Sequence, residues 1–362
     1  MPTDDKLIEV RGLKTHFFLD QGVVKAVDGV DFDLHRGETL CIVGESGCGK
    51  SITARSLMQI VDPPGRIVAG EMLLHRRAGG NGGGQVEDVV DLAKLAPNGR
   101  EIRAIRGKEI AMIFQEPMTS LSPVHTIGRQ ISQAILLHNK VTKEEARQQT
   151  IETLRLVGLP KPELRVDGYP FQLSGGMRQR AMIAMALSCH PSLLIADEPT
   201  TALDVTTQAQ ILDLMIGLQE ELGMAMMFIT HDLGVVAEIA DRVVVMYLGI
   251  VAESGDVDTI FGQPQHPYTQ ALLRSIPRVG GGVRQRLDSI KGMVPDPYNR
   301  PKGCPFHTRC SKRIPGVCDR TLPARATVGE GHEVSCLLYS MPRLSGHDGQ
   351  GGGLPNRRGG MA

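Results

Sequence analysis

The chain has 362 residues, and its 40 Lys and Arg residues balance its 40 Asp and Glu residues. This length allows one large domain with appendages or two domains, and the balanced charge gives no overall basic field of the kind that attracts nucleic acid. The acidic start, MPTDDKLIEV, has no secretory apolar region, and no apolar run approaches the about 20 residues that cross a membrane, so we expect a cytoplasmic protein whose membrane role would need a partner.

Residues 6–40 alternate apolar and polar side chains, which predicts strands joined by turns near residues 20–22 and 36–37. Phe17 and Phe18 lie in this stretch, in a chain with few aromatic residues. Either ring could be a half-buried strand residue. Either could also be a platform on which an adenine ring stacks.

Residues 40–56 predict a buried strand, a glycine-rich loop and the start of a helix. The loop matches the pattern G-x-x-x-x-G-K-[ST]. Its residues are Gly44, Glu45, Ser46, Gly47, Cys48, Gly49, Lys50 and Ser51, and Ile52 continues into the helix. Glycines let backbone N–H groups converge on a polyphosphate. Lys50 adds a positive charge and Ser51 a hydroxyl suited to Mg²⁺, so the sequence predicts a nucleoside triphosphate site.

The following stretch carries weaker signals. The glycine-rich piece at 78–85 predicts a hairpin tip or insertion. Gln115 directly follows an apolar strand, where it could lie at a ligand-binding crevice or simply in a solvated loop. Residues 126–160 have helical periodicity that ends at Gly158 and Pro160.

A second informative segment covers residues 169–204. Its Ser-Gly-Gly sequence opens a helix through Met185 and offers another set of backbone N–H groups to an anion. A buried strand then ends in Asp197, which suits a Mg²⁺ shell, and Glu198, which could activate water. The same carboxylates could merely cap the next helix. A further apolar strand ends in His231, a residue that is either structural or close to the γ-phosphate.

Taken together, roughly residues 6–275 resemble an ABC-type ATPase subunit. The motifs correspond as follows: the phosphate loop to Walker A, Gln115 to the Q-loop, LSGGM with Ser174, Gly175 and Gly176 to the signature motif, LLIADEP with Asp197 and Glu198 to Walker B, Ala202, Leu203 and Asp204 to the D-loop, and His231 to the switch histidine. Met177 stands where the signature motif often has Gln.

The resemblance implies an α/β P-loop fold with an antiparallel β subdomain and a helical signature subdomain at about 115–180, within an ATPase domain over 1–260. It also implies ATP and Mg²⁺, with the metal held by Ser51, Gln115 and Asp197. Lys50, Gln115, Glu198 and His231 would act in catalysis, with Phe17 as the adenine platform, although the register with Phe18 stays open. ATP would lie between the Walker A loop of one subunit and the signature motif of another.

Residues 264–278 and 301–310 resemble the C-terminal extension of oligopeptide and dipeptide importer ATPases, and the stretches FQEPMTSLSP and SGGMRQRAMIAMAL resemble their D-type subunit. The resemblance implies an F-type partner ATPase, two permease subunits, an extracytoplasmic peptide-binding protein and a peripheral place on the cytoplasmic face of the membrane. Import of nickel or another small solute is an alternative. An ABC ATPase acting on nucleic acid or ribosomes would carry a coiled-coil insertion or two cassettes, which this sequence lacks.

Four cysteines lie near the end of the chain, Cys304, Cys310, Cys318 and Cys336. Four thiolates suit zinc or an iron–sulfur cluster, and the short C-x₂₋₄-C pairs typical of structural zinc are absent. The resemblance favours a [4Fe-4S] cluster, which some members of this branch carry at matching cysteines. Zinc with His307 or His332 as a ligand and unliganded thiols are alternatives. We expect residues 261–340 to form this extension and residues 341–362 to be disordered.

Overall fold

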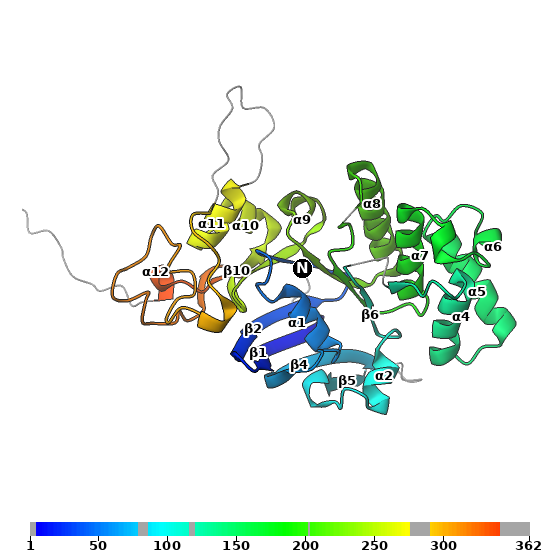
Figure 1. Ribbon diagram of the computed structural model, residues 1–362, viewed down its shortest axis with the longest axis horizontal. Coiled ribbons are helices and arrows are strands. Elements are labelled where there is room, and N and C mark those ends of the chain that lie inside the picture. The colour runs from blue at the N-terminus through cyan, green and yellow to red at the C-terminus, as the bar shows by residue number, and fades with distance from the viewer. Residues whose placement is uncertain (1–4, 79–85, 116–119, 202, 276–289, 341–362) are drawn as a thin grey trace, which may run out of the picture.

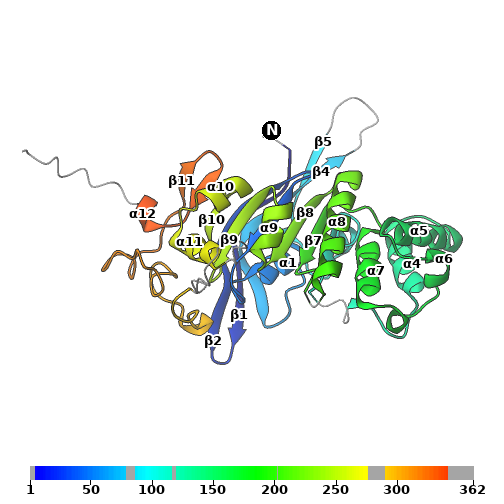
Figure 2. The same ribbon diagram turned by 90° about the horizontal axis from the view of Figure 1, so that it is seen from above.

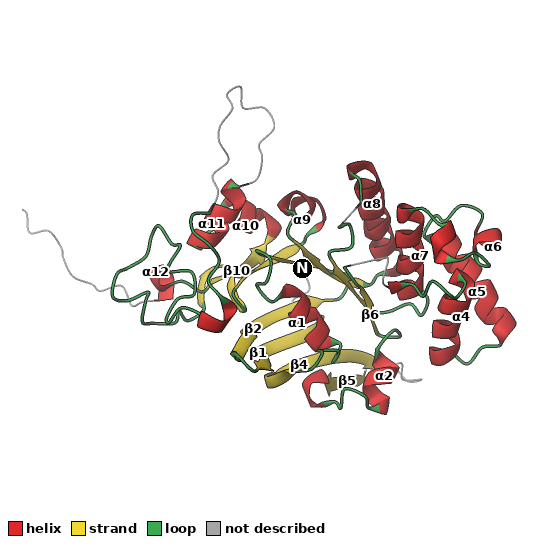
Figure 3. Ribbon diagram, viewed as in Figure 1, coloured by secondary structure: helices red, strands yellow, loops and turns green. Residues whose placement is uncertain are grey.

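The computed structural model describes residues 5–78, 86–115, 120–201, 203–275 and 290–340. Within them, two β-sheets enclose helix α1 (Lys50–Leu57), and further helices cover the opposite face of the larger sheet (Figures 1 and 3). A group of helices lies at one end of the molecule, and the C-terminal extension lies at the other end (Figure 1).

The smaller sheet is antiparallel, with strand order β2-β1-β4-β5. Its strands are β1 (Lys6–Leu19), β2 (Gly22–His35), β4 (Gly65–Ala78) and β5 (Val86–Asp91). The strands and turns predicted for residues 6–40 are confirmed. Strands β4 and β5 pair up to Ala78 opposite Val86, so they flank the glycine-rich piece as a hairpin, and residues 79–85 themselves lie outside the described residues.

The larger sheet has the order β11-β12-β10-β9-β3-β8-β7-β6. Its strands are β3 (Thr39–Val43), β6 (Ile110–Ile113), β7 (Leu193–Asp197), β8 (Ala225–Thr230), β9 (Arg242–Tyr247), β10 (Ile250–Asp256), β11 (Ala326–Gly329) and β12 (His332–Val334). The five strands from β9 to β6 are parallel. Residues of β3, β7 and β8 are buried throughout, which explains why these strands are uninterrupted apolar runs in the sequence.

The remaining helices are α2 (Arg100–Ile105), α4 (Ile127–His138), α5 (Lys143–Leu156), α6 (Pro162–Arg165), α7 (Gly175–Leu187), α8 (Val205–Leu222), α9 (Leu233–Ile239), α10 (Val257–Gly262), α11 (Pro267–Arg274) and α12 (Leu337–Ser340). Short 3₁₀ turns occupy Leu92–Lys94, Pro170–Gln172 and Pro297–Asn299. Helices α4 and α5 confirm the periodicity of residues 126–160, and α7 runs two residues past the predicted end at Met185. In the described part of the chain, no helix is both long and apolar enough to cross a membrane.

Part of the C-terminal extension is continuous with the larger sheet. Strand β12 pairs with β10, with Glu253 opposite Val334. The carboxylate of Glu253 is fully buried. It accepts hydrogen bonds from the backbone N–H groups of Gln265 (2.6 Å) and His266 (3.0 Å), and it pairs with His332 Nε2 at 2.7 Å. These contacts anchor the extension to the larger sheet.

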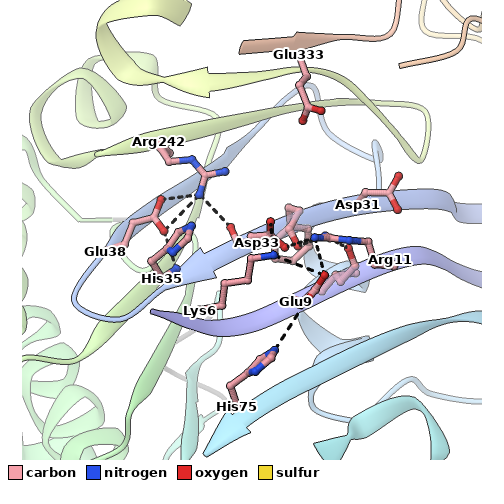
Figure 4. A network of polar contacts seen from close by, with 12 residues as sticks. Lys6, Glu9, Arg11, Asp31, Asp33, His35, Glu38, His75, Arg242 and Glu333 are labelled. Atoms are coloured by element: carbon pink, nitrogen blue, oxygen red, sulfur yellow. Dashed lines mark hydrogen bonds and ion pairs between the residues drawn. The ribbon is translucent and has the colours of Figure 1, made fainter. Parts of the chain in front are cut away.

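A network of charged side chains connects the two sheets (Figure 4). From β9, Arg242 donates to the Asp33 carbonyl oxygen of β2 at 3.2 Å and to the Glu38 carboxylate at 3.0 Å. Within the smaller sheet, Arg11 of β1 pairs with Glu9 of the same strand at 2.7 Å and with Asp33 of β2 at 2.6 Å. Because these groups join β1 and β2 to a strand of the larger sheet, they fix the orientation of the antiparallel sheet next to α1.

Candidate functional site

The phosphate loop connects β3 to α1 and lies tightly against neighbouring backbone. Gly44 (φ 150°) and Gly49 (φ 103°) have positive φ angles that favour glycine. A Cβ at Gly44 would lie 2.2 Å from the Met246 carbonyl oxygen, and one at Gly49 would lie 2.3 Å from that of Ala26. The two glycines are therefore required for the close approach of the loop to adjacent strands.

The side chain of Lys50 is buried and turned back over the phosphate loop. Its Nζ donates hydrogen bonds to the carbonyl oxygens of Gly44 at 2.8 Å and Glu45 at 3.3 Å. The ammonium group therefore lies within the curve of the loop, where a polyphosphate would be bound. Cys48 is buried beside it, and burial raises the pKa of its thiol, which fits the expectation of a small packed side chain.

Ser51 and Asp197 meet at the end of the sheet. Ser51 Oγ donates a hydrogen bond to Asp197 Oδ1 at 3.0 Å. Asp197 is buried, and burial raises the pKa of its carboxyl group, an effect that the Ser51 hydrogen bond opposes. A nearby cation would stabilise this buried carboxylate, and a hydroxyl and a carboxylate are hard oxygen donors. The pair therefore fits Mg²⁺.

Glu198 gathers three polar side chains from separate segments. Its Oε2 accepts hydrogen bonds from Gln115 Nε2 at 2.9 Å and from Thr201 Oγ1 at 3.1 Å, and its Oε1 lies 3.2 Å from His231 Nδ1. Its backbone has φ 46° and donates to the Ile229 carbonyl oxygen at 2.9 Å. The structure thus brings together three residues predicted to act in catalysis, Gln115, Glu198 and His231, and adds Thr201, which no motif in the sequence indicated.

The signature residues begin helix α7. Ser174 is its N-cap and accepts a hydrogen bond from the Met177 N–H at 3.4 Å. Ser174 and Gly175 are exposed, and Figures 1 and 2 both place α7 beside α4 and α5, away from α1. The first turn of α7 therefore does not border the phosphate loop of its own chain. Asp204 caps α8 by accepting from Thr207 N–H at 3.0 Å.

The D-loop correspondence is only partly visible, because Ala202 lies outside the described residues. The two candidate adenine platforms have different surroundings. Phe17 packs over Gly65, where an added Cβ would lie 2.6 Å from its ring. Phe18 is exposed, and the Arg66 guanidinium lies 4.0 Å from the centre of its ring. An adenine stacking on Phe18 would have to use the opposite face of the ring or displace this cation.

The four C-terminal cysteines are neighbours in space. The pKa of Cys304 is raised to about 11, mainly by burial and further by the charges of the other three thiols. In the part of the chain that the structure describes, however, no group of three or more His, Cys, Asp or Glu side chains is arranged to hold a metal ion. His307 Nδ1 lies 2.8 Å from the Cys304 carbonyl oxygen, and His332 is paired with Glu253. Metal binding here therefore stays a prediction.

Comparison with known proteins matches two regions of the chain to described families. Residues 27–201 match the ABC transporter family. Residues 252–318 match the oligopeptide/dipeptide transporter C-terminal region. The second match begins on β10 and covers the first three of the four C-terminal cysteines.

The chain is also similar to solved ATP-binding cassettes. A dimeric cassette, MJ0796, in a post-hydrolysis state bound to ADP and Pi, has a TM-score of 0.59 and 25% sequence identity, covering 69% of this chain and 99% of that one. The cassette cbiO1 from Clostridium perfringens, part of the transporter complex cbiONQ, has a TM-score of 0.56 and 26% identity, covering 72% of this chain and 92% of that one. These likenesses confirm the predicted ATPase fold.

Full-length relatives are closer in sequence. A probable peptide ABC transporter ATP-binding protein of Sinorhizobium fredii is 48% identical over 92% of this chain and 96% of its own length. From Bacillus subtilis, the oligopeptide transport protein AppD is 50% identical and the dipeptide transport protein DppD 48% identical, each over 92% of this chain and over 97% and 95% of its own length. The chain therefore belongs to the ATPase subunits of the oligopeptide/dipeptide ABC transporter family, in its D-type branch.

Proposed function

We propose that this chain is the ATP-hydrolysing subunit that powers import of dipeptides or oligopeptides through a membrane transporter. The observation that carries the proposal is that Gln115 and His231 both contact Glu198, directly after the Asp197 that contacts the phosphate loop. The extension of the same chain matches the peptide transporter family. The subunit would act peripherally, on the cytoplasmic face of the membrane.

In this proposal the loop from Gly44 to Ser51 binds the phosphates of ATP, and Lys50 neutralises their charge. Ser51, Asp197 and Gln115 would hold Mg²⁺, which supplies positive charge to the transferred phosphoryl group. Glu198 accepts a proton from the attacking water. The water oxygen bonds to the γ-phosphorus while the bond to the β-phosphate oxygen breaks, giving ADP and inorganic phosphate. His231 orients the carboxylate and the γ-phosphate.

The second half of the site would come from another subunit. The exposed N-terminus of α7, with Ser174, Gly175 and Gly176, presents backbone N–H groups and the positive end of a helix dipole. These groups suit the γ-phosphate of an ATP bound to a partner chain. Asp204 of the D-loop would lie at the same contact. Two solved structures of one similar cassette, MJ0796, are described as dimeric, which supports this pairing, and an F-type ATPase is the proposed partner.

The other proposed partners are two permease subunits and an extracytoplasmic peptide-binding protein. The test is transport by the complete complex, reconstituted in lipid vesicles with the binding protein. We expect uptake of a labelled dipeptide or short oligopeptide that depends on ATP. ATP-dependent uptake of nickel without uptake of peptides would support the alternative solute and contradict the proposal.

We further propose that Cys304, Cys310, Cys318 and Cys336 hold a [4Fe-4S] cluster, whose contribution would be to stabilise the extension. Support comes from the closeness of the thiols, since Cys310, Cys318 and Cys336 each contribute to the raised pKa of Cys304, and from the chemistry of an all-thiol donor set. Zinc is the alternative metal.

A further inference from the structure

A residue of the C-terminal extension reaches the phosphate loop. Arg309 lies between Cys304 and Cys318 in the sequence, yet its Nη1 is 2.6 Å from Glu45 Oε2 and its Nη2 is 3.0 Å from Glu45 Oε1. The side chain of Arg309 is only 4% exposed, and that of Glu45 is 24% exposed. This bidentate, largely buried pair joins residues 264 positions apart in the chain.

Tyr268 of helix α11 makes a second contact with the same loop residue. Its hydroxyl oxygen accepts a hydrogen bond from the Glu45 backbone N–H at 2.9 Å. The ring of Tyr268 is fully buried and packs with those of Tyr247 and Phe306, at centroid distances of 4.7 and 5.3 Å. Arg309 Nη1 also donates to the Tyr247 hydroxyl at 3.4 Å. The aromatic cluster therefore holds both contacts rigidly in place.

Every polar group of Glu45 is thus engaged. The extension binds its N–H and its carboxylate, and Lys50 of the phosphate loop donates to its carbonyl oxygen at 3.3 Å. The carboxylate carries a negative charge in a loop that has to bind a polyanion. Without a counter-charge it would repel the phosphates. Arg309 supplies that counter-charge and also fixes the first turn of the loop.

We propose that Arg309 is a positioning residue for ATP, through which the C-terminal extension sets the conformation and the charge of its own chain's phosphate loop. A structural contact alone would stabilise the fold and leave nucleotide affinity unchanged. Because coupling between two sites is reciprocal, a bound nucleotide must in turn stabilise the extension. The proposal does not depend on metal binding by the four thiols, since the Arg309–Glu45 pair is complete without it.

The test measures the Kd of the Mg²⁺ complex of AMP-PNP, a non-hydrolysable ATP analogue, by calorimetry on the full-length chain. We expect Arg309→Met to raise this Kd about tenfold, because it leaves the Glu45 charge unpaired beside the phosphates. We expect Arg309→Met combined with Glu45→Gln to recover most of the loss, because the repelling charge is gone. A Kd for Arg309→Met within twofold of the parent value would overturn the proposal, as would an equal loss in the double variant.

Two further variants keep the test decisive if Arg309→Met folds poorly. Arg309→Lys retains the charge but loses the bidentate contact with Glu45, so we expect a Kd between those of the parent chain and Arg309→Met. Arg325→Met is the matched control, because Arg325 also joins the extension to the core, through Ser254 Oγ at 3.1 Å, without touching the phosphate loop. We expect its unfolding temperature to fall and its Kd to stay unchanged. A rise in the Kd of Arg325→Met equal to that of Arg309→Met would show a general loss of stability and overturn the proposal.

Hydrogen exchange gives a readout that does not depend on affinity. In the parent chain, binding of the analogue should slow amide exchange across residues 304–318, the segment that carries Arg309. In the Arg309→Met and Glu45→Gln double variant this protection should disappear. Exchange in residues 304–318 that is the same with and without the analogue in the parent chain would refute the reciprocal coupling.

Discussion

Glu198 combines a left-handed backbone (φ 46°) with a carboxylate that faces Gln115, Thr201 and His231. Such a conformation costs on the order of 1–3 kcal/mol in a residue other than glycine and persists only where the surroundings enforce it. Here the N–H bond to Ile229 and the three side-chain contacts enforce it. The carboxylate is thereby held at the end of β7, next to the Asp197 carboxylate that suits Mg²⁺.

Substitution of this carboxylate by an amide of the same shape tests its proposed role as the proton acceptor. We expect Glu198→Gln to lower ATP hydrolysis by about a hundredfold or more, because general base catalysis contributes roughly 10²–10⁴-fold. Nucleotide affinity should be retained, because the phosphate loop is unchanged. The measurements are phosphate release and calorimetric binding. Thr201→Ala, which removes one hydrogen bond and keeps the carboxylate, should cost less than tenfold, and normal turnover in Glu198→Gln would exclude Glu198 as the base.

At the scale of single elements, the first turn of α7 is the group that the proposed function assigns to the partner subunit. Gly175 is exposed, and a Cβ added to it would meet no atom within 4 Å. An acidic residue in the first turn of a helix also interacts favourably with the helix dipole. The fold can therefore accept Gly175→Asp without strain, and any effect of this change has to come from what approaches the helix end.

We expect Gly175→Asp to leave nucleotide binding by the isolated chain unchanged and to reduce ATP hydrolysis of the assembled transporter about tenfold or more. The introduced carboxylate would face the γ-phosphate bound to the partner subunit and repel it. Gly175→Ala is the matched control and should retain most activity. Steady-state hydrolysis of the reconstituted complex checks both variants. Full activity of the aspartate variant would mean that this helix end does not approach the nucleotide.

At the scale of the whole molecule, we expect the stability of the extension to depend on pH through a buried histidine. Burial lowers the pKa of His266 to about 4, and its Nδ1 accepts a hydrogen bond from the Tyr268 N–H at 3.0 Å. In the unfolded chain the pKa returns to about 6.5. Between these values the unfolded state binds the proton and the folded state does not. Stability is therefore complete above about pH 6.5 and decreases as the pH falls toward 4.

This linkage predicts that His266 alone lowers the free energy of unfolding by about 2 kcal/mol between pH 8 and pH 5. Denaturant unfolding across this range measures it. His266→Asn keeps an N-cap oxygen for α11 but no group that titrates here, so the variant should be less stable throughout and show a flatter dependence on pH. An unchanged slope in the variant would place the pH dependence in other groups.

The four thiols give a second prediction at this scale. We expect anaerobically purified protein to be brown, with about four irons per chain. The pKa values of Cys304 and Cys336 are raised to about 11, chiefly by burial. Metal binding would therefore displace protons, and reconstitution of the apoprotein should be more complete at pH 8 than at pH 6. Metal analysis and visible absorption check this, and a colourless protein with one zinc per chain would refute the cluster.

Motifs with a local cause were predictable from the sequence. The phosphate loop, the strands that precede Asp197 and His231, and the helix that opens at Ser174 depend on glycine spacing, apolar runs and capping residues within a few positions. The contact of Arg309 with Glu45 depends on tertiary packing. Thr201 lies only three residues after Glu198 and contacts it through a local turn that no motif in the sequence marks. No periodicity connects Arg309 to Glu45, because they come together only when the extension folds over the end of β9. The only signal in the sequence for this contact was the presence of a charged residue, Arg309, in a segment with few periodic apolar residues.

The buried Glu253 has a consequence for where this protein can be divided. Strand β12 covers the edge of β10, and His332 together with two backbone N–H groups surrounds the Glu253 carboxylate. A fragment ending near residue 260 would uncover an unpaired strand edge and leave a carboxylate without donors inside apolar surroundings. Such a fragment should aggregate rather than fold as an active ATPase domain. The C-terminal extension is thus an integral part of the larger sheet, because it supplies the strand that pairs with β10.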